Sequence, residues 1–414
     1  MQIDSLSLFH IALPRKAPKI IAGRPCETLE TVLVKLTSGG AGGWGEATPG
    51  NAPTGNSEWA AGAFAVLRDW LAPAVVKIEI DSGKTLAERI APLRGNQYAK
   101  AALDIAWWDL SARMQNRPLG ELLGAKRQAV EVGPCLDRME SPGEFMAAIA
   151  AAFDAGFRRV KLKIRPGWDL EMLRGVRQEF PGGTFHIDCE GALSLNYMET
   201  LYRFDDFALE MVEQPLAAED LVAHAMLQES LRTPICLDEG IASPLQAEMA
   251  LDLKSCRHVN LKAGRVGGLT AAMTILEACQ AAEVSCWGGA SAQSAIGARA
   301  DLALAARADS DYPADFFPAE SELAEDLAEP LHPLRAAGDG AVKITCTAGP
   351  DWALFRIQRC WASSRSRRPK CSVGPRSFIT VFLVFSAAGS SRRQAAISSP
   401  AFRRDQGRIG RQEQ

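Results

Sequence analysis

Five ionisable residues recur at nearly constant intervals along the middle of the chain. They are Lys163, Asp188, Glu213, Asp238 and Lys262, and the intervals between them are 25, 25, 25 and 24 residues. One strand–helix unit of a (β/α)₈ barrel takes about 25–30 residues, since eight units make a barrel of about 200–250 residues. The intervals therefore predict one ionisable side chain at the carboxyl end of each of five successive strands, where barrel enzymes place their chemistry.

The residue before each of the five is aliphatic, which predicts where their side chains point. Successive side chains of a strand face opposite sides, so the aliphatic residues face the helices and the ionisable ones face the barrel axis. Buried charge without a partner is very costly. Three carboxylates around a divalent cation, flanked by two ammonium groups, would balance the charges, and oxygen ligands favour Mg²⁺ or Mn²⁺ over zinc. The aliphatic residues are Leu162, Ile187, Val212, Leu237 and Leu261.

Lys161 lies two residues before Lys163, so its side chain is expected on the same side of the strand. Its positive charge would lower the pKa of Lys163 and help to make a neutral amine base. The alternative is a surface lysine near a strand edge. For the five residues as a set, the alternative of solvated loop side chains is disfavoured. It explains neither their shared register nor their order of base, acid, acid, acid, base.

The elements that would position these residues change in character near residue 130. Before it, the β-branched run Thr31–Leu36 and the glycine-rich turn before Trp44 predict a hairpin, and Ala99–Met114 has a helical pattern. After it, short aliphatic runs alternate with amphipathic stretches, which predicts βαβ units and an α/β barrel. The expected strands are Arg159–Ile164, Thr184–Cys189, Ala208–Glu213, Pro234–Asp238, His258–Lys262 and Val284–Trp287.

The composition is that of a globular protein, with 47% hydrophobic and 23% charged residues among 414. Its ten cysteines occur singly and without metal-finger spacing, which suits reduced thiols. The first residues contain neither the basic nor the apolar region of a secretory signal. We therefore expect a cytoplasmic protein.

Residues 351–414 differ from the rest in charge. They contain 13 Lys+Arg against 3 Asp+Glu, whereas residues 1–350 contain 33 against 46. A basic tail can indicate nucleic acid or an acidic membrane. However, the change comes abruptly after an unfinished pattern, and Phe378–Phe385 is too short to span a bilayer. We expect neither partner and hypothesise that the tail is a frameshift product. An intact reading frame in the source DNA, with relatives that share the tail, would contradict this.

Several motifs along residues 1–348 carry a resemblance to a known family. They are Arg159–Ile164 with Pro166–Asp169, Val212–Leu216, Asp220–His224, Arg232–Glu239, Val259–Gly268, and Ala101–Leu110 with Arg117–Gly120. On these motifs the chain resembles the enolase superfamily, in its muconate-lactonizing-enzyme subgroup, and in particular the o-succinylbenzoate synthases and N-acylamino acid racemases. The resemblance implies a modified TIM (β/α) barrel with an N-terminal α+β capping domain. The chain is then expected to divide into a capping domain with a lid loop (1–130), a catalytic barrel (131–325), a return to the capping domain (326–350) and the atypical tail (351–414).

The resemblance also implies roles for the five residues. Asp188, Glu213 and Asp238 would bind Mg²⁺, and Lys163 and Lys262 would stand on opposite faces of a small carboxylate substrate. Lys163 would remove the proton next to the carboxylate and give an enediolate. The preferred reaction is the dehydration that forms o-succinylbenzoate in menaquinone synthesis. The alternatives are racemisation of N-acylamino acids, epimerisation of dipeptides, and a metal-binding barrel that no longer catalyses. A Schiff-base lysine aldolase is disfavoured, because it needs no set of three acids.

Some positions depart from the family pattern and place the substrate in question. Glu190 stands where asparagine is usual, Gly240 where serine is common, Ala263 where proline is common, and Gln293 where many relatives have glutamate. The segment Pro14–Cys26 should form a lid loop whose lysines Lys16 and Lys19 face an anionic substrate, although a solvated basic loop is as compatible. Expected substrate contacts are Glu190, Lys16, Lys19 and Gln293. His186 is expected to be a barrel-strand residue rather than a catalyst, and the protein is expected to be a homo-oligomer.

Overall fold

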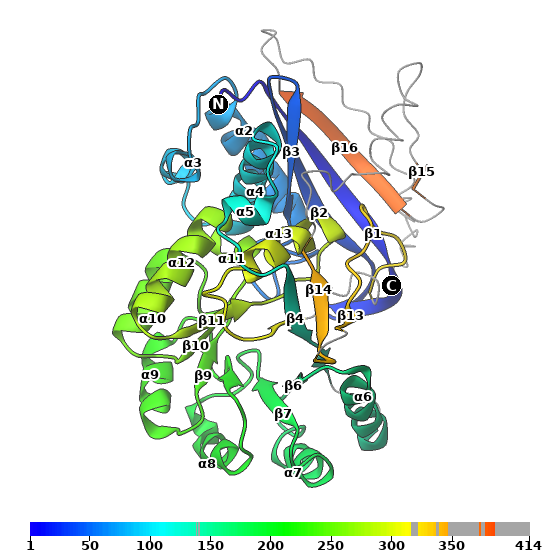
Figure 1. The fold of residues 1–414 in the computed structure, drawn as a ribbon, viewed down its shortest axis with the longest axis vertical. Coiled ribbons are helices and arrows are strands. Elements are labelled where there is room, and N and C mark those ends of the chain that lie inside the picture. Colours follow the sequence, from blue (N-terminus) through cyan, green and yellow to red (C-terminus); the bar gives the residue numbers. More distant parts are fainter. Residues whose placement is uncertain are drawn as a thin grey trace, which may run out of the picture.

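The computed structural model describes residues 1–137, 139, 141–315, 322–336 and 339–346, and the backbone of two strands at 372–373 and 377–385. The rest of the basic tail lies outside the described residues. Two bodies are visible in Figure 1: a sheet with helices formed by the N-terminal third of the chain, and a ring of strands and helices formed by the middle. No helix among the described residues is long and apolar enough to cross a membrane.

The N-terminal domain is built on an antiparallel sheet. β1 (Ser5–Ile21), β2 (Arg24–Ser38) and β3 (Ala41–Ala47) are neighbours in chain order, which confirms the predicted hairpin. On the other side, β1 pairs antiparallel with β16 (Ser377–Phe385), which in turn pairs with β15 (Ser372–Val373). The basic tail therefore contributes backbone to the edge of this sheet.

Helices cover one face of this sheet and form its core. α4 (Gln97–Met114) lies directly against β3, and two glycines permit the close approach: a Cβ at Gly45 would lie 2.0 Å from Ala102 O, and one at Gly43 would lie 2.2 Å from Leu110 N. α4 is buried on nearly all sides because it also contacts α11 (Ala263–Val266) and α12 (Leu269–Ala281) of the second domain. The helical elements are α1 (Ala60–Val66), a π-helical turn (Leu67–Leu71), α2 (Ala72–Val75), α3 (Gly83–Ile90), α4 (Gln97–Met114) and α5 (Leu119–Leu122).

Seven parallel strands form the main sheet of the second domain. Their spatial order follows the chain, from β5 to β11, and each of the six predicted strands overlaps one of them. The strands are β5 (Cys135–Leu136), β6 (Arg159–Lys163), β7 (Thr184–Asp188), β8 (Val212–Glu213), β9 (Ile235–Leu237), β10 (His258–Leu261) and β11 (Ser285–Gly288).

The helices of the second domain lie outside the strands, as Figure 1 shows. They are α6 (Pro142–Ala155), α7 (Leu170–Glu179), α8 (Met198–Arg203), α9 (Leu221–Ser230), α10 (Pro244–Asp252), α11 (Ala263–Val266), α12 (Leu269–Ala281) and α13 (Ala295–Ala305). Short 3₁₀ turns flank α8 at Leu195–Tyr197 and Phe204–Asp206.

A second, smaller sheet brings the ends of the main sheet together. β12 (Ala314–Asp315) pairs parallel with β4 (Ala129–Gly133), and β14 (Val342–Thr345) joins β4 to β13 (Leu334–Arg335). β12 contacts β11, and β4 contacts β6. The domain is therefore a modified TIM barrel, and the N-terminal domain caps it.

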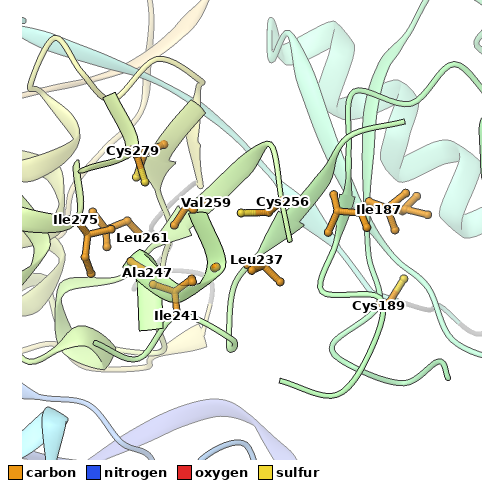
Figure 2. Close-up of a cluster of buried hydrophobic side chains, with 14 of the residues drawn as sticks. Ile187, Cys189, Leu237, Ile241, Ala247, Cys256, Val259, Leu261, Ile275 and Cys279 are labelled. Carbon is orange, nitrogen blue, oxygen red and sulfur yellow. The ribbon is translucent and has the colours of Figure 1, made fainter. Parts of the chain in front are cut away.

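The core between strands and helices has the composition that the alternation predicts. The five aliphatic residues before the ionisable ones, Leu162 to Leu261, all belong to one buried cluster. Figure 2 shows part of it, with Leu237 and Val259 of β9 and β10 on the same side of the view as Ile241 and Ile275, and Ile187 of β7 on the other side beside Cys189. Because these side chains face outward, the residues that alternate with them face the barrel interior.

The expected lid loop Pro14–Cys26 is instead a β-hairpin. Lys19 pairs with Cys26 and Ile21 with Arg24, and the turn between the strands has positive φ at Ala22 (51°) and Gly23 (73°). Two successive positive φ values make the turn that matches the twist of a two-stranded ribbon, which explains why the strands continue to their ends. The hairpin contacts the chain after residue 321, where Ala324 N donates to Pro14 O at 2.9 Å.

The expected domain boundaries stay predictions. After residue 321, Leu323 and Leu327 pack against Phe9 and Trp44 of the capping sheet. The chain then continues into β13 and β14 beside the barrel strand β4.

Candidate active site

The five ionisable residues lie along the carboxyl edge of the barrel sheet. Lys163, Asp188 and Glu213 are the last residues of β6, β7 and β8. They are direct neighbours in the strand register. Asp238 and Lys262 follow the last residues of β9 and β10. The three carboxylates therefore stand on adjacent strands, with one lysine on each side of them.

Lys161 is buried beneath these carboxylates and is not a surface lysine. Its Nζ donates to both carboxylate oxygens of Glu213, at 3.0 and 3.1 Å. It also lies 3.0 Å from Asp315 Oδ2 and 3.6 Å from Asp188 Oδ2. Burial would lower the pKa of Lys161, but the carboxylates of Asp315, Glu213 and Asp188 raise it well above its ordinary value. Lys161 is therefore a fixed positive charge.

Lys262 and Arg265 hold Asp238 from two sides. Lys262 Nζ donates to Asp238 Oδ2 at 2.7 Å, and the guanidinium of Arg265 contacts the other oxygen. Burial opposes ionisation of Asp238, but Arg265 and then Lys262 outweigh it, so its pKa lies well below the ordinary value. Lys262 precedes α11, whose tight turn brings Arg265 back to the same carboxylate. Both residues keep Asp238 ionised.

Lys163 contacts Glu190 at the mouth of the barrel. The Glu190 carboxylate forms an ion pair with Lys163 Nζ, and the backbone N–H of Glu190 donates to Asp188 Oδ1 at 3.1 Å. Glu190 has a φ of 47°, which turns the chain sharply just after β7. Burial would lower the pKa of Lys163, but Asp188 and Glu190 raise it above its ordinary value. The expected lowering by Lys161 is thus not observed, because the carboxylates outweigh burial and the charge of Lys161 is taken up by Glu213 and Asp315.

The three carboxylates suit a hard divalent cation in donor chemistry. Within the part of the chain that the structure describes, no three Asp, Glu, His or Cys side chains are gathered closely enough to hold a metal ion as they stand. The ammonium groups of Lys161 and Lys262 are paired with them instead. Burial, and next the charge of Glu213, raise the pKa of Asp188 to about 7. An oxygen-only donor set of three carboxylates fits Mg²⁺ or Mn²⁺.

Asn260, His186 and Asp315 have polar contacts with Glu213 or Lys161 and were not singled out from the sequence as part of the site. Asn260 Nδ2 donates to Glu213 Oε1 at 2.6 Å, and His186 Nε2 lies 3.4 Å from Glu213 Oε2. Asp315 lies on β12 and pairs with Lys161. Burial and the charge of Arg159 lower the pKa of His186 well below its ordinary value, so its ring is neutral, in keeping with its expected strand role.

The sequence held a signal for each of these three residues. Asn260 and His186 lie two residues before Lys262 and Asp188, so the strand period of two places them on the same face, one layer deeper. The next two strand ends after Lys262 are expected at similar intervals. Trp287 follows Lys262 by 25 residues, and Asp315 follows Trp287 by 28. Asp315 was missed because its strand has only two residues.

The expected substrate contacts lie in different places. Glu190 lies at the site, beside Lys163. Gln293 is buried and donates to Asp301 Oδ2 at 2.8 Å. Lys16 and Lys19 are exposed on the hairpin, where Lys19 Nζ lies 2.6 Å from Glu322 Oε1. Contact of these four residues with a substrate stays a prediction.

Comparison with known proteins agrees with this architecture. A family described as enolase C-terminal domain-like matches residues 144–345, and the mandelate racemase / muconate lactonizing enzyme N-terminal domain matches residues 5–124. The chain is 36% identical over 359 residues to an o-succinylbenzoate synthase of Geobacillus kaustophilus, which covers 86% of this chain and 95% of that protein. It is 36% identical over 330 residues to an N-succinylamino acid racemase of Thermus thermophilus, covering 80% and 89%.

The fold comparison gives the same result. A crystal structure of an enolase superfamily member from Listeria innocua matches with a TM-score of 0.83 and 28% identity, over 93% of this chain and 99% of that one. Both domains, their order and the length of the match agree with the sequence comparisons. The chain belongs to the enolase superfamily, in its muconate-lactonizing-enzyme subgroup.

Proposed function

We propose that this enzyme removes a proton from the carbon next to a substrate carboxylate, with Mg²⁺, and that its reaction is the dehydration that yields o-succinylbenzoate. The observation that carries the proposal is the arrangement of two lysines, on β6 and after β10, around three carboxylates on the strands between them. The small carboxylate substrate, the link to menaquinone synthesis and the cytoplasmic location belong to the same proposal.

Asp188, Glu213 and Asp238 would hold the cation. When bound, it would neutralise the negative charge that develops on the substrate carboxylate as the proton leaves. Asp238 is kept ionised for this task by Lys262 and Arg265. Mn²⁺ has the same preference for oxygen ligands and would serve as a substitute.

The two lysines would perform the proton transfers. Lys163 would take the proton from the carbon onto Nζ in its neutral form. The Asp188 charge that raises the pKa of Lys163 in this structure would then be engaged by the bound cation. In the dehydration Lys163 then gives this proton to the hydroxyl group, which leaves as water while the new carbon–carbon double bond forms. Lys262 stays charged, since Asp238 lies 2.7 Å from its Nζ, and it stabilises the negative charge of the intermediate from the other face.

Racemisation of N-acylamino acids is the second candidate. The relatives include both a synthase and a racemase at 36% identity, and both reactions begin with removal of the same kind of proton. In a racemase, Lys262 would donate its proton to the face opposite Lys163. Epimerisation of dipeptides would use the same two steps. A barrel that binds the cation without catalysis is the remaining alternative.

Loss of the ultraviolet absorbance of the cyclohexadiene precursor distinguishes these candidates. We expect fast loss with the full chain and Mg²⁺, and none after a chelator is added. Absorbance that stays constant, with deuterium entering N-succinylamino acids in D₂O, would replace the synthase by the racemase. If the protein binds the cation and catalyses neither reaction, the remaining candidate is a metal-binding barrel that no longer catalyses.

A further inference from the structure

The barrel interior below the site is charged, although branched aliphatic residues usually fill a TIM barrel. The inward side chains of β6 are Arg159, Lys161 and Lys163, three cations in one column. Arg159 and Lys161 are only 1% and 3% exposed. Two such buried cations require negative partners within hydrogen-bond distance.

Asp315 supplies negative charge to both buried cations. Its Oδ2 lies 3.0 Å from Lys161 Nζ, and its Oδ1 accepts from Arg159 Nη2 at 3.1 Å. The Asp315 side chain is itself buried, with 5% of the residue exposed. One carboxylate on the short strand β12 thus joins the two cations of β6 across the point where the barrel closes.

Arg159 is fixed from several directions, so it holds Asp315 in place. Its Nη2 also donates to Pro313 O at 2.9 Å, and its guanidinium lies over the rings of Trp287 and Tyr312, 5.4 and 5.6 Å from their centres. Gly133 makes room for it, because a Cβ there would lie 2.4 Å from Arg159 Nε. The position of Asp315 is therefore determined by the barrel and not by the mouth of the site.

Lys161 is shared between Asp315 and the carboxylates proposed to bind the cation. Its Nζ lies as close to Asp315, at 3.0 Å, as to Glu213, at 3.0 and 3.1 Å. A lysine has three N–H donors. Without Asp315, these donors and the whole charge of Lys161 would fall on Glu213 and on Asp188, 3.6 Å away. Both carboxylates would then compete less well for a divalent cation.

We propose that Asp315 is a positioning residue: it balances the charge of Lys161 and so leaves Glu213 and Asp188 able to bind the divalent cation. The proposal rests on the proposed function, because it assumes that these two carboxylates bind the cation. It makes Asp315 part of the site through its contact with Lys161.

The test is Mn²⁺ binding to the full chain, measured without substrate by electron paramagnetic resonance of the free ion. Asp315→Asn keeps the shape of the side chain and removes its charge. Loss of a group that orients a metal ligand typically costs 10–100-fold in affinity, so we expect Mn²⁺ to bind about 10–100-fold more weakly. The matched control is Asp104→Asn, another buried carboxylate, which accepts from Thr270 between α4 and α12. It should leave the Mn²⁺ affinity unchanged.

Lys161→Met separates charge balance from a structural effect. With the ammonium removed, Asp315→Asn should change the Mn²⁺ affinity by no more than about twofold, the scatter expected of independent sites. Lys161→Met alone should bind Mn²⁺ at least as tightly as the wild type, and it tests the idea even if Asp315→Asn does not fold.

Three outcomes would overturn the proposal. They are wild-type affinity in Asp315→Asn, an equal loss in the Lys161→Met background, and weaker binding by Lys161→Met alone. A wild type that binds no Mn²⁺ would overturn both this proposal and the proposed function. If the wild type binds Mn²⁺ and Asp315→Asn shows the expected loss of affinity, but the wild type catalyses neither reaction, the proposed function is wrong and the role of Asp315 stands.

Discussion

At the scale of single residues, the site depends on how each lysine is paired. Lys161 is surrounded by three carboxylates and acts as a fixed charge. Lys163 has one partner at the mouth, Glu190, whose carboxylate is half exposed. Lys262 shares Asp238 with Arg265. The side chain with the most exposed partner, Lys163, is therefore the one best placed to meet a substrate.

The division of labour between the lysines gives a prediction for Lys262→Ala. Lys163 should still remove the proton from its own face of an N-succinylamino acid, while return of a proton from the other face is lost. We expect deuterium to enter one enantiomer in D₂O with racemisation slowed about 10²–10⁴-fold, the usual contribution of a general acid. Proton nuclear magnetic resonance with chiral analysis measures both quantities.

The control for this variant is Lys84→Ala, which removes an exposed lysine on α3 of the capping domain. It should behave as the wild type. Equal loss of exchange and racemisation in Lys262→Ala would show that the two lysines do not act on separate faces.

At the scale of elements, the contact between α4 and β3 fixes the capping domain. The contact depends on glycine, because a Cβ at Gly45 would lie 2.0 Å from Ala102 O, a backbone atom that cannot move independently of the helix. The same helix reaches the barrel through Asp104, which accepts from Thr270 N at 3.0 Å and Thr270 Oγ1 at 2.5 Å. α4 is therefore the element on which both domains depend.

Gly45→Ala should destabilise the protein. Overpacking of a tight contact typically costs about 1–3 kcal/mol, so we expect the free energy of unfolding, measured in urea, to fall by about 1–3 kcal/mol or more. Gly55→Ala is the matched control, since a Cβ at Gly55 would meet nothing within 4 Å. Similar stability of the two variants would show that α4 can move away from β3 at little cost.

Asp104 should make stability depend on pH. Burial raises its pKa to about 6, from an ordinary value of 3.8, so the folded state favours the protonated form. This contribution is fully present below about pH 4 and is lost as the pH rises to about 6. Asp104→Asn should reduce the fall in unfolding free energy across this window by about 1–3 kcal/mol. Urea unfolding at pH 4, 5 and 6 measures it, and an unchanged slope would contradict the assignment.

Most elements were predictable from the sequence because their periodicity is strong. The strands at Arg159–Lys163 and Thr184–Asp188 agree with prediction to within one residue. β8 begins at Val212 and not at Ala208, because Ala208 has a φ of 46°, which a strand cannot include. Pro14–Cys26 was expected to be a loop because proline and lysine are frequent there. Its backbone pairing and its turn at Ala22 and Gly23 could not be predicted from the amino-acid composition of the segment.

At the scale of the whole molecule, two cores are joined by buried polar contacts. One core lies between the capping sheet and its helices, and the other surrounds the barrel strands. Between them, Glu46 of β3 accepts from Ser294 Oγ at 2.6 Å and from Gly297 N at 2.8 Å, at the start of α13. The homo-oligomeric state is a property of the same scale and stays a prediction, which light scattering after gel filtration would measure.

The candidate site was predictable from the sequence in its residues more than in its pairings. The regular interval identified the five residues at the strand ends, because each strand–helix unit of the barrel repeats at that interval. The strand period of two placed Lys161 on the same side as Lys163. The pairing of Lys161 with Asp315 was not predicted, since it joins strands that are far apart in the chain and meet only when the barrel closes.

The central claim is that Lys163 removes a proton next to a carboxylate with the help of a divalent cation. The direct measurement follows turnover of the cyclohexadiene precursor and entry of deuterium into N-succinylamino acids in D₂O, for the wild type and Lys163→Ala, with Mg²⁺ and with chelator. We predict reaction of at least one substrate by the wild type, none with chelator, and a loss of about 10²–10⁴-fold or more in Lys163→Ala. Undiminished turnover by Lys163→Ala, or turnover that persists in chelator, would contradict the account.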